Sequence, residues 1–433
     1  MVGMAKVFAV LGWSSSQAGP PLLVAKTWTA ATSEPCLAQA RRPVANNAPR
    51  FLASTPRGCQ SFVRGFCGPS SARGKMGEGK NLVGIDIGTS SIKVCQLKES
   101  RKASTLMRFG YAELAPQTIV DGQVMDAGAV VETLLRVFHD ARIRQKEVAL
   151  SVSGQTVIIR KIAVPIMTAA ELDEQIHWEA EQHIPFKIED VQIDYQVLRR
   201  RPEASQMDLL LVAAKRDQIS DYAQLARDAK LKPIVCDIDA FTVQNMFEFS
   251  RGLPPDQTIA LINIGASLSS LNIIANGVSS FTREIANGGN VITEEIQKQL
   301  QVPYEQAEAY KCGGGGASAD PTQPGMVPAQ VMQVIETVSD SVAAEIQRSL
   351  DFFMATSGEG ELSRIVVTGG SANLPALAQA IERRARVPVE AWLPTERLSV
   401  MSKDVDANLL QTRAAQLPVA LGLALRKERE VAA

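Results

Sequence analysis

The sequence has no apolar run long enough to span a membrane. Its longest runs have the length of a strand, for example residues 259–264, whereas a transmembrane helix needs about 20 predominantly apolar residues. We therefore expect no direct membrane insertion, and expect any membrane association to depend on a partner.

The sequence also lacks an excess of charge and a pattern typical of a metal site. Its 433 residues carry a formal net charge of −1, so electrostatics gives no reason to expect a nucleic-acid partner. The histidines His139, His177 and His183 are dispersed, and the six cysteines contain no CxxC pair, so we predict no metal cluster and reduced thiols. Neither GxGxxG nor GxxxxGKS/T occurs in its structural context, which excludes Rossmann and P-loop proteins.

Composition changes near residue 75. Residues 1–75 are rich in Ala, Ser, Pro, Arg and Gly, and they contain nine basic residues and one acidic residue, a net charge of +8. No helix or strand period runs through them, so we expect this leader to lie outside the fold. Three explanations stay open: a reading that starts too early, with Met76 as the true start; a disordered arm; and an organelle-type targeting segment.

From residue 76 onward, one strand–turn–strand pattern occurs twice. Residues 82–87 and 92–97 are strand-like and are joined by a turn at Gly88, with a third strand expected at about 105–112. This internal repeat predicts two α/β halves. The second copy has strands at 259–264, 268–274 and 278–285, and further strands are expected at 148–152, 157–162, 193–198, 208–213 and 364–368.

Two predicted helices have a clear apolar face. The first follows from apolar residues at i, i+3, i+4 and i+7. The second begins with a capping box, Thr168 and Glu171, and is ended by Pro185. The predicted faces are Val131, Leu134, Leu135 and Phe138 in the first helix, and Leu172, Ile176, Ala180 and Ile184 in the second.

The turn of the first hairpin, residues 86–93, has the composition of a phosphate-binding loop. Gly88 allows backbone amides to approach a phosphate, and neighbouring hydroxyls add donors. Asp86, at the end of a strand, is placed to orient Mg²⁺ through its water ligands. Taken alone, the segment is also compatible with an ordinary tight hairpin. The candidate phosphate-binding residues are Gly88, Thr89, Ser90, Ser91 and Lys93.

Three later segments could complete a nucleotide site. Residues 263–267 repeat the first loop, residues 366–374 end a strand in two glycines that permit close approach of a flat ring, and residues 287–298 place two glycines at a helix start. Ordinary turns, and an exposed ion pair on the helix, are the alternatives. The candidates are Asn263, Gly265, Ala266 and Ser267; Gly369, Gly370 and Ser371; and Gly288, Gly289, Glu295 and Lys298.

In this order, the segments resemble the actin, sugar-kinase and heat-shock-chaperone ATPase superfamily. The resemblance implies an actin-like, duplicated ribonuclease H-like α/β fold with ATP and Mg²⁺ bound in a cleft between two halves. Residues 237–242 and 418–425 fall where its two connecting helices are expected. One departure matters: Asn263 stands where a carboxylate is usual, and an amide adds no negative charge, so we expect at most slow ATP hydrolysis.

Within the superfamily, residues 178–186 resemble the PilM family of the type IV pilus machinery, and the order of elements after residue 148 resembles the subdomain inserted in PilM and FtsA. The polar residues after 425 differ from the membrane-targeting helix of FtsA. The expected domain pattern is a leader at 1–75, the first part of domain 1 at 76–147, an inserted subdomain at 148–235, a connecting helix at 236–258, domain 2 at 259–400 with a flexible loop at 312–328, and a return to domain 1 at 401–433.

The PilM resemblance implies a cytoplasmic ATP-binding scaffold held at the inner membrane by a protein partner. That partner would be the N-terminal cytoplasmic peptide of PilN, from the PilN/PilO complex, with Trp178 and Phe186 as contact residues; core packing of these rings is the alternative. Further expectations are contacts with the pilus motor ATPase and platform protein, assembly into a ring, and support of pilus biogenesis and twitching motility.

Two other functions stay open at this point. An FtsA-like cell-division protein would form ATP-dependent polymers on lipid. A sugar-kinase-type phosphotransferase would need a catalytic carboxylate, for which Asp239 is the only candidate, and helix capping is the more ordinary role for that residue.

Overall fold

The computed structural model describes residues 8–9, 79–99, 104–313, 328–358, 360–401 and 403–428. Of the leader 1–75, it therefore describes only Phe8–Ala9, which form strand β1 and pair antiparallel with β11 (Lys232–Ile238). For these two residues, the expectation that the leader lies outside the fold was wrong, because pairing with the backbone of an edge strand needs no apolar pattern in the added strand. Most of the predicted flexible loop, 314–327, also lies outside the described residues. Within the described part, no helix is both long and apolar enough to cross a membrane.

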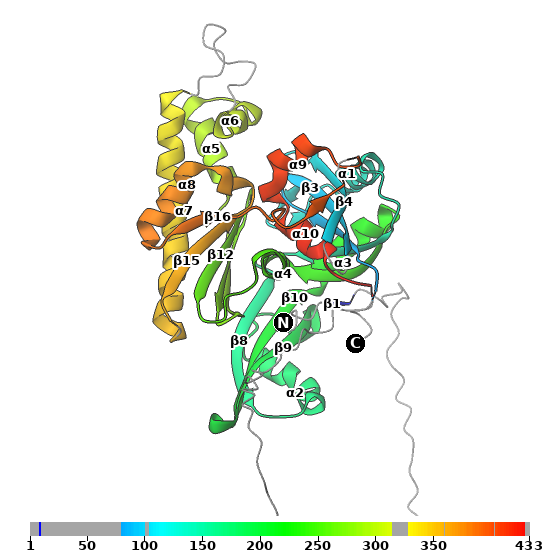
Figure 1. The fold of residues 1–433 in the computed structure, drawn as a ribbon, viewed down its shortest axis with the longest axis vertical. Helices are drawn as coiled ribbons and strands as arrows, with labels where there is room; N and C mark the ends of the chain where they lie inside the picture. The colour runs from blue at the N-terminus through cyan, green and yellow to red at the C-terminus, as the bar shows by residue number, and fades with distance from the viewer. Residues whose placement is uncertain are drawn as a thin grey trace, which may run out of the picture. The chain divides into compact units, whose positions relative to one another are not determined.

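The first half is built on a mixed seven-stranded sheet with the order β1-β11-β7-β2-β3-β4-β17 (Figure 1). The predicted hairpin is confirmed as β2 and β3, with β4 as the third strand of the meander. All five residues of β2 are buried, as expected for a central strand covered on both faces. The strands are β2 (Val83–Ile87), β3 (Ser91–Glu99), β4 (Ser104–Glu113), β7 (Glu147–Val152) and β17 (Ser399–Val400), and a small separate hairpin contains β5 (Ile119–Val120) and β6 (Gln123–Val124).

Helices α1 (Ala127–Asp140) and α3 (Arg216–Asp228) pack on this sheet. The predicted face of α1 was wrong in part, because Leu135 is 47% exposed. Asp126 caps the helix by accepting from the Ala129 amide, and the buried stripe then falls at i, i+4, i+7 and i+8. It consists of Val130, Leu134, Val137 and Phe138.

A separate three-stranded sheet, of order β8-β10-β9, carries helix α2 on one face. The predicted face of α2 is confirmed, since Leu172, Ile176, Ala180 and Ile184 are all buried. The capping box is also confirmed: Thr168 accepts from the Glu171 amide, and Glu171 accepts from the Thr168 amide. The elements are β8 (Val157–Pro165), α2 (Ala169–Glu181), the 3-10 helix η1 (Ile188–Asp190), β9 (Val191–Arg201), η2 (Pro202–Ala204) and β10 (Gln206–Lys215).

This sheet and its helix, which we call the inserted sheet, span residues 157–215. They are narrower than the range 148–235 expected for the inserted subdomain. β7 and β11 overlap the two ends of that range but pair with each other in the seven-stranded sheet. The burial of Val148–Val152 on both faces of β7 fits the centre of a parallel sheet and not a half-exposed subdomain edge.

The second half is built on a five-stranded sheet of order β14-β13-β12-β15-β16 (Figure 1). Its predicted meander is confirmed as β12, β13 and β14. Helices α5, α7 and α8 bury their apolar faces against this sheet. The elements are β12 (Thr258–Ile264), β13 (Ser269–Ala275), β14 (Val278–Ile285), α5 (Gly289–Leu300), α6 (Tyr304–Lys311), α7 (Ala329–Ser357), β15 (Leu362–Thr368), η3 (Gly370–Asn373), α8 (Pro375–Ala385) and β16 (Val389–Ala391).

Helices α4 (Asp239–Arg251) and α10 (Pro418–Ala424) form the crossing between the halves. In the chain, α10 follows α9 (Ala407–Arg413) and η4 (Ala414–Gln416). Their side chains share one buried cluster with both sheets. The two backbones touch at Gly422: a Cβ atom there would lie 2.6 Å from the carbonyl carbon of Thr242. At the end of α10, the fully buried Arg426 forms an ion pair with Asp237 of β11, with N···O distances of 2.5 and 2.8 Å.

Candidate functional site

The two predicted phosphate loops lie opposite each other and touch. The Ser267 hydroxyl, in the second half, donates to Thr89 Oγ1 in the first half at 3.1 Å. Asn290 Nδ2, from the first turn of α5, donates to Ser267 Oγ at 3.3 Å. Residues 178 positions apart in the sequence therefore meet through hydroxyl groups, as a ligand held between the halves would require.

The first loop carries a buried charge pair beside its glycine. Asp86 and Lys93 are cross-strand partners on β2 and β3, and their charged groups are 3.3 Å apart. Lys93 Nζ also donates to the Ser91 carbonyl at 3.3 Å. A Cβ atom on Gly88 would lie 3.0 Å from Lys93 Nζ. The glycine thus keeps the space in front of the ammonium open.

The start of α5 packs directly on the second loop. The Gly289 amide donates to the Gly265 carbonyl at 3.0 Å, and the Asn290 amide donates to the Ala266 carbonyl at 2.8 Å. A Cβ atom on Gly288 would meet the Gly265 carbonyl oxygen at 2.7 Å. The amides of Gly289 and Asn290 therefore hold the second loop in place by donating hydrogen bonds to its carbonyl groups.

The third motif joins the same place. Gly369 has φ +95°, and a Cβ atom there would lie 2.7 Å from both the Ile264 amide nitrogen and Asn263 Oδ1. Such a positive φ favours glycine. Ser371 Oγ donates to the Gly265 carbonyl at 3.0 Å. Gly370 faces the side chain of Gln416. The third motif and the start of α5 therefore meet at Gly265 of the second loop, and Ser267 joins that loop to the first.

A buried lysine that the sequence reasoning missed lies against the first turns of α5. Lys311 Nζ contacts Glu308 Oε2 at 2.6 Å and Thr293 Oγ1 at 2.8 Å, and it donates to the Gly289 carbonyl at 3.3 Å. Glu295 and Lys298 instead form an i, i+3 ion pair at 3.7 Å, with Lys298 78% exposed. Glu308 and Lys311 have the same i, i+3 spacing, which was the available signal in the sequence.

Two more buried carboxyl groups follow Asp86 in a series: Asp239 lies near Asp86, and Glu284 lies near Asp239. Asp239 begins α4, and its burial together with the negative charge of Asp86 raises its pKa to about 6. Glu284 of β14 accepts a hydrogen bond from the Gly154 amide, and burial together with the charge of Asp239 raises its pKa to about 8. Across the second sheet, Asn263, Ser270 and Glu284 are successive partners. No group of His, Cys, Asp and Glu side chains suited to bind a metal directly occurs among the described residues.

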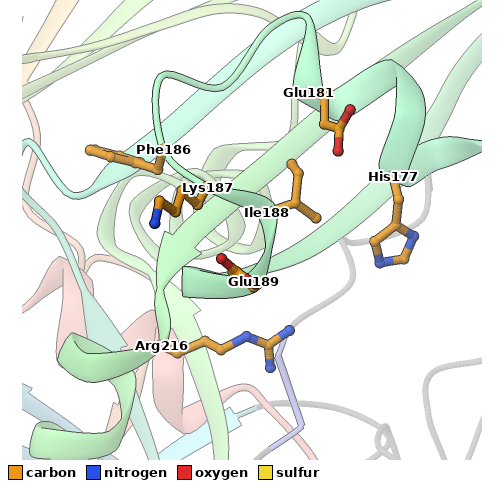
Figure 2. A pocket seen from close by; sticks show the side chains of 7 residues that line it. All are labelled: His177, Glu181, Phe186, Lys187, Ile188, Glu189 and Arg216. Atoms are coloured by element: carbon orange, nitrogen blue, oxygen red, sulfur yellow. The ribbon is translucent and has the colours of Figure 1, made fainter.

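The inserted sheet carries a pocket of about 680 Å³. Figure 2 shows Phe186 and Lys187 on one side of it, with His177 and Glu181 on the neighbouring helix and Arg216 below. Phe186 is partly buried, and Lys215 Nζ lies 4.7 Å from its ring centroid. Trp178 does not line the pocket and is 74% exposed. The lining residues are His177, Glu181, Phe186, Lys187, Ile188, Glu189 and Arg216.

Comparison with known proteins assigns the family. The family model for the type IV pilus assembly protein PilM matches residues 84–428. The chain belongs to the PilM family. Among solved structures, it is similar to a PilM-PilN type IV pilus biogenesis complex, with a TM-score of 0.70 and 26% sequence identity over 81% of this chain and 98% of that chain. The predicted resemblance to PilM is thereby confirmed.

More distant relatives agree with this assignment. The cell division protein FtsA of Neisseria meningitidis serogroup B is 23% identical over 351 residues, covering 72% of this chain and 83% of the relative. FtsA of Streptococcus pneumoniae serotype 2 is 21% identical over 352 residues, covering 73% and 76%. The expected fold class, an actin-like α/β fold, is confirmed for this PilM-family chain.

Proposed function

We propose that this PilM-family chain is an ATP-binding scaffold of type IV pilus assembly, held at the cytoplasmic face of the inner membrane by the N-terminal peptide of PilN. The contact between Thr89 and Ser267 carries the nucleotide half of the proposal. It brings hydroxyl groups from both halves to one point, so a polyphosphate placed there would touch both loops.

Each part of the proposed site has a defined task. Lys93 and the hydroxyls of the first loop bind phosphate oxygens, and Asp86 orients Mg²⁺ through water. Ala266 and Ser267 face the phosphates from the second half, and Gly369 and Gly370 allow the adenosine to approach the backbone.

The same site is expected to hydrolyse ATP slowly. Asn263 supplies an amide where a carboxylate would add negative charge near the metal. Lys311 and Glu308, close to Gly289, are additional candidates for contacts with the ribose. We infer that the bound nucleotide fixes a conformation of the scaffold and that rapid turnover is not its role.

The peptide half of the proposal rests on the pocket in the inserted sheet. Phe186 and Ile188 give it apolar walls, while Glu181, Glu189 and Arg216 place both signs of charge around them. A short extended peptide is recognised through such alternating apolar and polar contacts. Links to the motor ATPase and platform protein, ring formation and twitching motility are parts of the same proposal.

A synthetic peptide of the PilN N-terminal segment tests it. We expect a micromolar dissociation constant, about −8 kcal/mol, by calorimetry. Phe186→Ala should weaken binding while the melting temperature changes little, because Phe186 lines the pocket and Trp178 does not. Met125→Ala is the matched control, because Met125 is 66% exposed and lies outside the pocket. No binding by the wild-type chain, with and without ATP, would remove the PilN half of the proposal.

A further inference from the structure

A loop of the first half is held directly by the second half. Residues 153–156 connect β7 to β8, and therefore connect the seven-stranded sheet to the inserted sheet. The Gly154 amide donates to Glu284 Oε2 on β14. Gly154 has φ +102°, and a Cβ atom there would lie 3.9 Å from Leu268 Cδ1 of the second half. We call the Glu284–Gly154 hydrogen bond the clasp.

On the Glu284 side, the clasp is electrostatically linked to the candidate nucleotide site. The negative charge of Asp239 acts on Glu284, and that of Asp86 acts on Asp239. Ser151 and Ser153, on either side of the end of β7, hydrogen-bond to the Asp239 carboxyl. The second oxygen of Glu284, Oε1, is buried without a hydrogen-bond partner. Because these charges act on one another in series, a cation bound beside Asp86 would change the electrostatic potential at Asp239 and at Glu284.

On the Gly154 side of the clasp, two contacts connect the loop 153–156 to the pocket. The Thr156 carbonyl accepts from the Lys215 amide at 3.3 Å, and the Lys215 ammonium lies over the Phe186 ring. In parallel, Gln218 of α3 donates to the Ser153 carbonyl at 2.9 Å and bonds to the Thr156 hydroxyl. Gln218 lies two residues after Arg216, a pocket residue that itself donates to Gln192 at 2.9 Å.

We propose that the clasp between Glu284 and Gly154 is the element through which a nucleotide in the cleft regulates the peptide pocket of the inserted sheet. The inference rests on the proposed function. When the halves close on ATP and Mg²⁺, the clasp fixes the loop 153–156, and the loop fixes Lys215 and the start of α3. The pocket walls are then preorganised, so the protein loses less conformational entropy when the peptide binds.

The test is a thermodynamic cycle with the full chain, Mg-ATP and the synthetic PilN peptide. For the wild type, we expect ATP to tighten peptide binding by about tenfold, within the usual range of allosteric coupling. Glu284→Ala should bind each ligand alone but show equal peptide affinity with and without ATP. Glu284→Gln retains a hydrogen-bond acceptor for Gly154 and should keep most of the coupling. Glu382→Ala, an exposed acid on α8, is the control and should behave as wild type.

A second readout needs no peptide. Addition of Mg-ATP should slow amide hydrogen exchange in residues 153–156 of the wild type, and should leave it unchanged in Glu284→Ala. Full coupling in Glu284→Ala, or binding of both ligands to the wild type with no coupling, would overturn the inference while leaving the proposed function intact. Failure of the wild type to bind ATP or the peptide would instead reject the proposed function, and the inference with it.

Discussion

Replacing Gly422 by Ala should force apart the two helices that cross between the halves. The added methyl would lie 2.6 Å from the Thr242 carbonyl carbon and nearer still to its oxygen, whereas ordinary contacts begin at 3.4 Å. The colliding atoms belong to the backbone of α4, so no side-chain rotation can relieve them. α10 must therefore retreat by more than about 0.8 Å.

The expected free energy follows from two opposing terms. Overpacking by a methylene costs about 1–3 kcal/mol, and the rigid backbone places this case at the upper end. Alanine in place of glycine in a helix returns about 1 kcal/mol. We expect a net loss of about 2 kcal/mol in the free energy of unfolding, seen in urea titration, and a fall of about 4 °C in Tm.

Gly360→Ala is the matched control for this prediction. No atom lies within 4 Å of the Cβ position at Gly360, and its φ is not in the positive range that penalises alanine, so its stability should equal that of wild type. A Gly422→Ala protein as stable as wild type, or more stable, would show that the helices do not cross with their backbones in contact.

Three further predictions concern charged and polar groups. Arg426→Met should cost about 3–5 kcal/mol, because Asp237 is left charged and buried, and the double variant with Asp237→Leu should recover most of this loss in urea titration. Burial raises the pKa of Glu284 from 4.5 to about 8, so the contribution of this group to the free energy of unfolding is full below pH 4.5 and is lost as the pH rises through about 8. Glu284→Gln should flatten this fall in stability. The same dependence of stability on pH in the variant and the wild type would contradict the raised pKa of Glu284. Asn263→Asp should raise ATP turnover or leave it unchanged in a phosphate-release assay, and a wild-type rate of tens per second would show that the amide does not limit hydrolysis.

The sequence predicted those parts of the fold that depend on local pattern. Both hairpins, the capping box of α2 and the buried face of that helix follow from residues close together in the chain. The predicted face of α1 was displaced because Val130 and Val137, which the periodic pattern left out, are buried, whereas Leu135, which it included, is exposed. The limits of the inserted sheet were too wide because pairing between β7 and β11 is long-range.

In the candidate site too, local features were predictable from the sequence and long-range contacts were not. The loops around Gly88, Gly265 and Gly369 were predictable because each has its own turn chemistry. Glu284 and Gly154 carry no local signal, since they meet only through the register of β14 and the close approach of the halves. Lys311 reaches Gly289 across the packing of α5 and α6, which periodicity alone does not reveal.

The measurement that tests the account most directly is a calorimetric titration of Mg-ATP into the wild-type chain and into Gly88→Val. The valine Cβ would lie 3.0 Å from Lys93 Nζ, the end of a flexible side chain, and no closer than 3.4 Å to any backbone atom, so the variant should still fold, and its melting temperature is measured beside its affinity. We predict that the wild type binds and that the variant binds at least about tenfold more weakly, a loss of about 1.4 kcal/mol or more. Equal affinity in the two proteins, or no binding by the wild type, would contradict the placement of ATP between the two loops.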